Sequence, residues 1–145
     1  MAYCTQTDVT NRFSQAKWWS DQAQAGAIDA AIVAANIGFA AGEINRYVGQ
    51  QYDVPLTLSD AGTASMISDA ATLLTGWKLA SRVNDRDALA AMDAAYKDLM
   101  SWLREIAAGK VKLKGETITS AESPTGGVVV AGDEVVVTRE SMSGL

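Results

Sequence analysis

The chain of 145 residues contains no histidine and a single cysteine, Cys4. Histidine is the commonest general base, the usual proton shuttle and a usual zinc ligand, so its absence removes the common routes to acid–base and zinc chemistry. One cysteine allows neither an intrachain disulfide nor a metal site made of several thiolates, and it favours a reducing compartment. We therefore expect a protein that is not an enzyme and that has no catalytic residues, no metal site and no cofactor.

Motifs that bind phosphate or calcium are also missing. The pattern GxxxxGK[ST] does not occur, Gly126-Gly127 is not followed by a helix-forming sequence, and no loop has EF-hand spacing. Four aspartates cluster between residues 85 and 98. Asp93 and Asp98 fall on different faces of a helix, while the other two lie where helix caps belong. These carboxylates are therefore interpreted as caps and solvated surface charges.

Positive charge and long apolar runs are scarce. The net charge is −5 and the isoelectric point is near 4.6, so the molecule repels nucleic acid unless its cations gather on one face. No run approaches the roughly eighteen apolar residues of a membrane span, and the first residues lack a basic region followed by an apolar stretch. We expect a cytoplasmic product with no membrane partner.

What is present is the composition of a folded domain, with 48% apolar and 20% charged residues. Helical periodicity predicts a mainly α fold, a small bundle of one short and three longer helices. The short helix is expected over residues 7–13, with Thr7 as its N-cap. The longer helices are expected over about 29–50, 60–84 and 85–109, with Asp29, Ser59 or Asp60, and Asn84 or Asp85 as N-caps, and with Gly109 closing the last.

Apolar residues at steps of three and four predict the core of the bundle. The helices over 29–50 and 85–109 carry the clearest stripes, so we expect these two to form most of the core. The predicted core residues are Ile37, Ile44, Leu74, Trp77, Leu89, Met92, Tyr96, Leu99, Leu103 and Ile106.

Two glycines, Gly38 and Gly42, interrupt the helix expected over 29–50. Each costs roughly 1 kcal/mol relative to alanine in a helix interior. Either another backbone approaches the helix closely there, or the glycines are merely tolerated, and the sequence favours neither explanation. A second apolar stripe on this helix, formed by Ile32, Ala35 and Phe39, predicts a helix that is central or shared with a neighbour.

The composition changes after Gly109, so we divide the chain into a helical domain, residues 1–109, and a β-prone arm, residues 110–145. Two valine triplets flank the turn-forming residues 131–134 and predict a C-terminal β-hairpin or extended arm. Two strands alone are marginally stable, so the arm is expected to pack on its own helices or on another chain. The triplets are Val128, Val129, Val130, Val135, Val136 and Val137.

Two further groups of residues are candidates for partner contacts. Lys110, Lys112 and Lys114 alternate, so in a strand their ammonium groups share one face, either as a surface for phosphates and acidic partners or as an edge that discourages aggregation. Trp18 and Trp19 are adjacent and cannot both face one core. At least one is therefore expected at an interface or under a loop.

The order of elements resembles the head–tail connector, or adaptor, family of tailed bacteriophages, in particular its Mu-like group. The resemblance covers about residues 1–115, and the chain departs from the family pattern in the helix expected over 60–84 and in its tail. The matching segments are Tyr3-Cys4-Thr5-Gln6-Thr7-Asp8-Val9 with Arg12-Phe13, Ala27-Ile28-Asp29, Glu43-Ile44-Asn45-Arg46-Tyr47-Val48, Gln51-Tyr52-Asp53-Val54-Pro55-Leu56, residues 96–103, and Ile106-Ala107-Ala108-Gly109-Lys110-Val111.

This resemblance implies a structural subunit of the virion neck, assembled in the cytoplasm of a bacterial host. It implies a closed ring of about twelve copies beneath the portal protein, with a tail-terminator or head-closure (stopper) protein on the other side. A closed ring needs a head-to-tail interface, so each subunit presents two different surfaces. DNA is expected to pass through the lumen without sequence recognition. The alternative from another class is a small helical DNA-binding or regulatory module that uses Lys110, Lys112 and Lys114.

Overall fold

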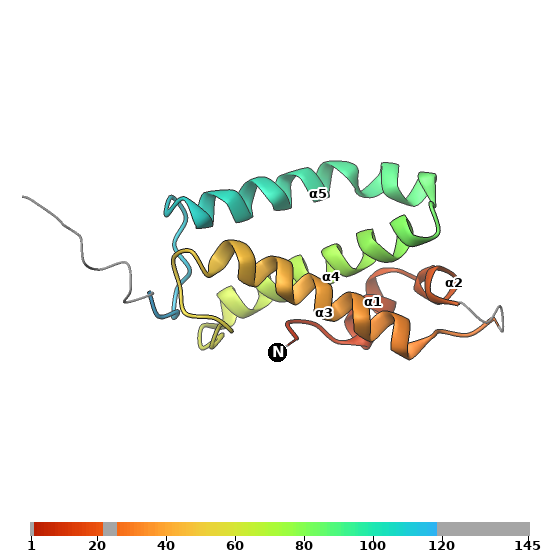
Figure 1. Ribbon diagram of the computed structural model, residues 1–145, viewed down its shortest axis with the longest axis horizontal. Coiled ribbons are helices and arrows are strands. Elements are labelled where there is room, and N and C mark those ends of the chain that lie inside the picture. Colours follow the sequence, from red (N-terminus) through yellow and green to blue (C-terminus); the bar gives the residue numbers. More distant parts are fainter. Residues whose placement is uncertain (1, 22–25, 119–145) are drawn as a thin grey trace, which may run out of the picture.

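The computed structural model describes residues 2–21 and 26–118 and is helical over most of them (Figure 1). No strand forms within these ranges, which confirms the prediction of a mainly α fold, and the one β-contact is an isolated antiparallel bridge between Tyr52 and Ile118. The predicted hairpin of the valine triplets lies outside the described residues. The helices are α1 (Gln6–Arg12), α2 (Ala16–Ser20), α3 (Ala30–Val48), α4 (Ala61–Arg82) and α5 (Arg86–Ala107).

Aspartates cap all three long helices, as predicted. Asp29, Asp60 and Asp85 each accept hydrogen bonds from backbone N–H groups in the first turn of the helix that follows. At the other end of α5, Gly109 takes the left-handed conformation expected of it, with φ +76°.

The N-cap predicted for the first helix was wrong, because Thr5 caps α1 and Thr7 lies inside it. The hydroxyl oxygen of Thr5 accepts from the backbone N–H of Asp8 over 3.2 Å, and the backbone N–H of Thr5 donates to the Asp8 carboxylate over 2.7 Å. This reciprocal capping box satisfies two backbone donors at once, which Thr7 cannot do from within the helix.

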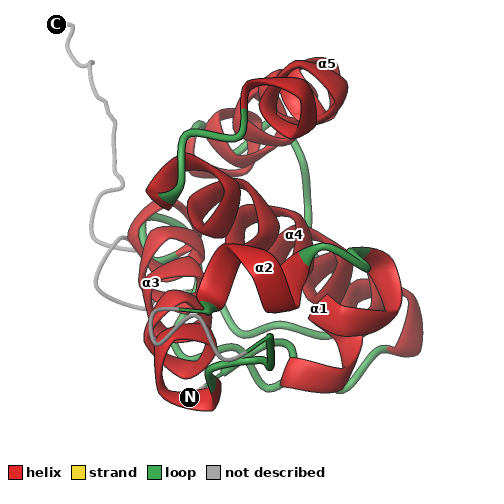
Figure 2. Ribbon diagram, turned by 90° about the vertical axis from the view of Figure 1, so that its right-hand side faces the viewer, coloured by secondary structure: helices red, strands yellow, loops and turns green. Residues whose placement is uncertain are grey.

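The central helix is α4, whereas the sequence pointed to the helices now seen as α3 and α5. Its residues are buried without a break from Ala70 to Gly76, so every side of the helix is covered there. It contacts each of the other four helices, and Figure 2 shows it between α5 and the short helices α1 and α2. The buried hydroxyls of Thr72 and Thr75 donate to carbonyls one turn earlier, at 2.8 Å each, so this polar run needs no outside partner.

The predicted core residues lie inside the bundle or against its core. The partly buried members pack on the core from its edge and are Trp77, Leu89 and Tyr96, with the rings of Trp77 and Tyr96 stacked at 4.1 Å. The buried members are Ile37, Ile44, Leu74, Met92, Leu99, Leu103 and Ile106.

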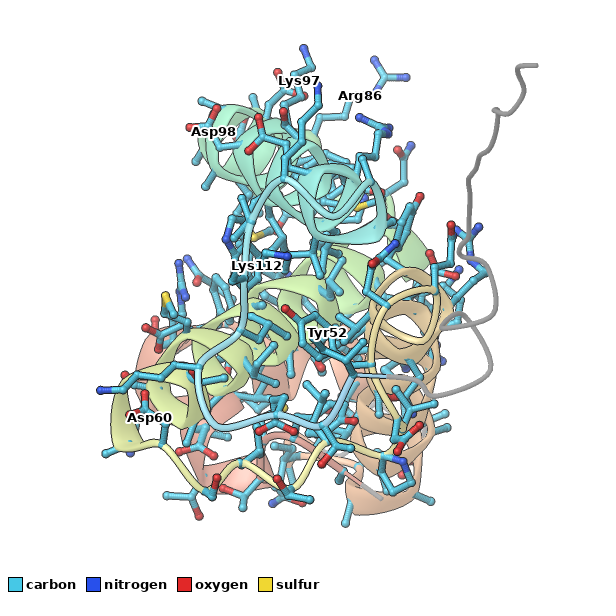
Figure 3. All side chains as sticks on the ribbon, turned by 90° about the vertical axis from the view of Figure 1, so that its left-hand side faces the viewer. Tyr52, Asp60, Arg86, Lys97, Asp98 and Lys112 are labelled. Carbon is cyan, nitrogen blue, oxygen red and sulfur yellow. The ribbon has the colours of Figure 1, made fainter. Side chains whose placement is uncertain are left out.

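Residues 110–118 lie against the helical body, mainly along the loop between α3 and α4. The Tyr52 hydroxyl, labelled by residue in Figure 3, accepts from the backbone N–H of Leu113 over 2.8 Å. The Glu116 carboxylate accepts from the backbone N–H groups of Thr57 and Leu58, again over 2.8 Å, and Leu58 has a left-handed backbone with φ 55°. The compact body therefore continues past residue 109 to Ile118.

None of the helices in the described ranges has the length and apolar character that would let it cross a membrane.

Candidate partner interface

The described part of the chain contains no group of three or more carboxylate or cysteine side chains placed to hold a metal ion. Cys4 is buried, with its sulfur 3.8 Å from the Thr75 hydroxyl, and burial raises the pKa of its thiol. Because the thiolate is the reactive form, this cysteine is a core residue in an unreactive setting.

The two adjacent tryptophans take opposite environments. Trp19 is buried in the core, where its indole N–H donates to the Asp85 carboxylate over 2.8 Å. Trp18 is 58% exposed, and the Lys17 ammonium lies 4.6 Å from the centre of its ring. Of these two tryptophans, only Trp18 therefore offers an apolar surface to a partner.

The three alternating lysines do not lie on a strand, so that expectation was wrong. Residues 110–115 form bends and a turn, because Gly109 and Gly115 take left-handed conformations at the two ends of the segment. Lys110, Lys112 and Lys114 are all exposed, while Leu113 between them is buried. Lys114 pairs with Asp60 over 3.4 Å, which partly neutralises the group.

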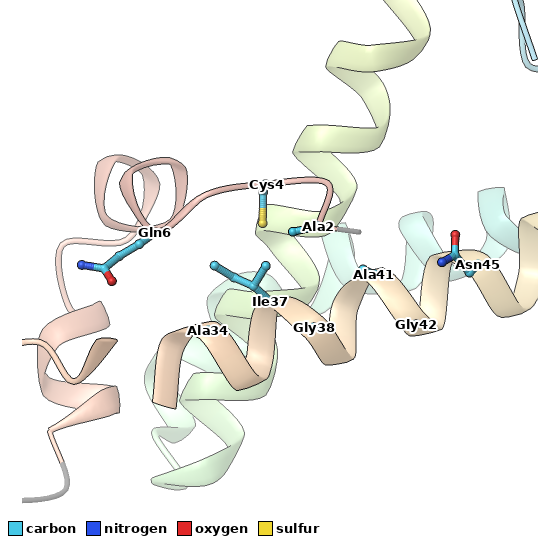
Figure 4. A pocket seen from close by; sticks show the side chains of 9 residues that line it. All are labelled: Ala2, Cys4, Gln6, Ala34, Ile37, Gly38, Ala41, Gly42 and Asn45. Carbon is cyan, nitrogen blue, oxygen red and sulfur yellow. The ribbon is translucent and has the colours of Figure 1, made fainter. Parts of the chain in front are cut away.

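A hollow of about 560 Å³ lies between α3 and the N-terminal segment (Figure 4). Gly38 and Gly42 line it, and a β-carbon added to either glycine would meet nothing within 4 Å. No backbone within the described chain therefore approaches these glycines closely. These two glycines are therefore either tolerated in the helix or approached closely by another molecule.

An apolar groove of about 420 Å³ runs between α5 and the α1–α4 side of the bundle. We call it the acidic groove and define it by Arg12 of α1, Met66, Asp69, Ala70 and Leu73 of α4, and Asp98, Leu99 and Trp102 of α5. Met66, one of these lining residues, is 47% exposed. Figure 3 shows Asp98 on the flank of α5 that points away from α3.

The charges of the acidic groove are available to a partner. Within residues 2–21 and 26–118, neither Asp69 nor Asp98 forms an ion pair. Arg12 brings a positive charge to the same groove, where its guanidinium lies 5.5 Å from the centre of the Phe13 ring and donates to the Asp69 carbonyl over 3.5 Å. The groove therefore combines an apolar floor with two carboxylates and one guanidinium, so its lining keeps a net negative charge.

A second surface lies across α3 and α4, which we call the Phe39–Lys78 patch after its two residues. Phe39 is 44% exposed, and the Lys78 ammonium lies 4.4 Å from the centre of its ring. Lys78 forms no ion pair with any residue that the structure describes. This patch therefore presents an aromatic ring and one unneutralised positive charge to solvent.

The two surfaces lie on different sides of the molecule. Asp69 and Lys78 are nine residues apart on α4, which is two and a half turns, so they project from opposite sides of that helix.

Neither surface was among the predicted contact residues. Phe39 belonged to the second apolar stripe found in the sequence, whereas the groove depends on the packing of three helices and has no signal in any one of them.

Comparison with known proteins gives one family. The family model described as "Bacteriophage Mu, Gp36" matches residues 3–131 of the chain. No curated protein matches the sequence.

Proposed function

The chain belongs to the Bacteriophage Mu, Gp36 family and is therefore a bacteriophage protein, and from this premise we propose that it is a structural virion protein, a head–tail connector subunit. Copies of the chain form a ring in the neck of the virion, between the portal protein and a tail-terminator or head-closure protein. The ring lines the channel through which DNA leaves the head, and it does not read the DNA sequence.

The observation that carries this proposal is the pair of unlike surfaces on one small body. A ring closes through head-to-tail contacts, which require each subunit to present two different patches. The acidic groove and the Phe39–Lys78 patch share no residue and differ in shape and charge. A subunit with a single patch that binds the same patch on another copy would instead form a twofold dimer.

Charge and fold give secondary support. The net charge of −5 lets DNA pass a lining of this protein without adhering to it. The helical body also agrees with the fold that the resemblance to connector proteins implies. Trp18 and the segment after Gly109 remain predicted contacts with the portal or with a neighbouring subunit.

The test is assembly on the portal protein encoded by the same phage. The full-length chain is mixed with portal rings, and the mass of the complex is measured by multi-angle light scattering and its shape by electron microscopy. We expect a ring of the chain stacked on one end of the portal. A chain that stays monomeric in the presence of portal rings would contradict the proposal, whereas a monomer without portal would not.

A further inference from the structure

We propose that the Phe39–Lys78 patch of one copy docks into the acidic groove of a second copy, with Phe39 on the apolar floor and Lys78 beside Asp69 and Asp98. The contact rests on the proposed ring, and it specifies which two surfaces of the subunit meet there.

The apolar part of the contact follows from exposure. Phe39 leaves 44% of its surface in water although it lies on a helix whose other face is buried. The groove has an apolar floor that includes Leu73, Leu99 and Trp102, and its volume is about 420 Å³. Burying an aromatic ring against such a floor removes apolar surface from water on both copies, and central aromatic residues carry much of the energy of protein interfaces.

The charges of the two surfaces are complementary. Lys78 has an ammonium group without an ion-pair partner in the described chain. The two carboxylates of the groove likewise form no ion pair there. Arg12 is the one positive side chain among the residues that line the groove, so the two carboxylates leave the groove with a net negative charge for Lys78 to meet. Complementary charges of this kind fix the register of an interface and exclude wrong pairings.

The positions of the charges prevent Lys78 from pairing with Asp69 of its own subunit, and they favour head-to-tail contacts between copies. Because Asp69 and Lys78 project from opposite sides of α4, one copy cannot close this contact on itself. Each copy therefore offers its patch in one direction and its groove in another, which is the condition for a ring or a helical filament.

Charge exchange tests the contact. The single variants Lys78→Glu and Asp98→Lys place like charges together, whereas the double variant Lys78→Glu with Asp98→Lys restores an attractive pair in reversed order. Assembly is measured as the concentration of chain that half-saturates ring formation on portal rings. We expect each single variant to raise this concentration about tenfold or more, and the double variant to return it to within about threefold of the unaltered chain.

Matched controls make the same charge changes elsewhere on the exposed surface. Arg86→Glu and Glu105→Lys lie outside both surfaces and should leave the half-saturating concentration unchanged. Phe39→Ala should weaken assembly about tenfold or more while the helical circular dichroism of the isolated chain stays the same.

The outcomes separate the two proposals. If the unaltered chain forms rings and the single variants assemble as well as the controls, the contact is refuted and the ring stands. If the single variants fail and the double variant fails at least as badly, the two surfaces bind different partners and the contact is again refuted. If the unaltered chain forms no ring on portal, both proposals are overturned.

Discussion

The indole N–H of Trp19 donates to the carboxylate of Asp85, and this bond of 2.8 Å ties α2 to the first turn of α5. The same carboxylate accepts from the backbone N–H of Ala88 and caps the helix. The guanidinium of Arg82 donates to the carbonyl of Trp19 over 2.9 Å from the end of α4. One buried tryptophan thus holds the α4–α5 turn in position.

Replacing Trp19 tests this role. Trp19→Phe keeps an aromatic ring but removes the donor, so we expect the thermal midpoint to fall by several degrees. Trp18→Phe alters an exposed ring and should leave the midpoint unchanged. Differential scanning calorimetry of the two variants makes the comparison, and equal midpoints would show that the bond to Asp85 contributes nothing.

Stability should also fall in acid through Asp85. The hydrogen bond from Trp19, followed by that from Ala88, holds the pKa of the Asp85 carboxyl below its ordinary value of 3.8. The unfolded chain therefore binds the proton more readily than the folded chain, and the stabilisation is fully present above that value and is lost as the pH falls through the lowered pKa. Asp85→Asn keeps a capping side chain, so it should lose less stability than the unaltered chain between about pH 5 and pH 2. Chemical denaturation at a series of pH values measures both slopes, and parallel slopes would contradict the assignment.

Gly76 has the tightest surroundings of the glycines in the described chain. A β-carbon at this position would collide with the ring of Phe13, so Gly76→Ala should destabilise the fold by about 1–3 kcal/mol. Adding Phe13→Ala removes the obstacle, and the loss in the double variant should be smaller than the sum of the two single losses. Urea denaturation provides the free energies of unfolding, and strictly additive losses would argue against the collision.

Gly38 provides the opposite case. Nothing lies within 4 Å of the position of its absent β-carbon, so Gly38→Ala should stabilise the isolated chain by up to about 1 kcal/mol. A decrease in the free energy of unfolding would contradict this prediction. Ring assembly of the same variant then distinguishes a tolerated glycine from one that a neighbouring molecule approaches, because only the second loses assembly.

The three lysines at residues 110–114 provide the test of the alternative function, a DNA-binding or regulatory module. We expect the triple replacement of Lys110, Lys112 and Lys114 by glutamine to leave DNA binding unchanged and weak, because the net charge is −5 and Lys114 pairs with Asp60. Fluorescence anisotropy at several salt concentrations measures the affinity. Tight, salt-dependent binding that the replacement abolishes would favour the alternative.

The sequence predicted those features that depend on local chemistry. The caps Asp29, Asp60 and Asp85 could be found because a carboxylate before an apolar stripe satisfies the free N–H groups of a helix start. The first cap was misplaced because Thr5 and Thr7 are both capping residues, and only the pairing with Asp8 separates them.

Features that depend on tertiary packing were missed. The central position of α4 was hidden because most of its buried residues are alanine, threonine or glycine, whose apolar signal is weak, and because Thr72 and Thr75 satisfy their hydroxyls within the helix. The lysine segment has the alternating pattern of a strand, but its backbone bonds to side chains of the body instead of to another strand. The backbone N–H of Leu113, for example, donates to the Tyr52 hydroxyl. The Phe39–Lys78 patch joins two residues that lie 39 positions apart on successive helices, so neither sequence segment alone indicates it.

The anchoring of residues 110–118 has a geometric consequence for any assembly. Glu116 and Tyr52 fix this segment, and the bridge to Tyr52 fixes Ile118 itself, so the chain leaves the body from a defined point beside the α3–α4 loop. In a ring with rotational symmetry, all copies of Ile118 lie at one height and at one distance from the axis. The exit points at Ile118 then form a circle, so weak attachments made from these points to a symmetric partner would act together as one strong attachment.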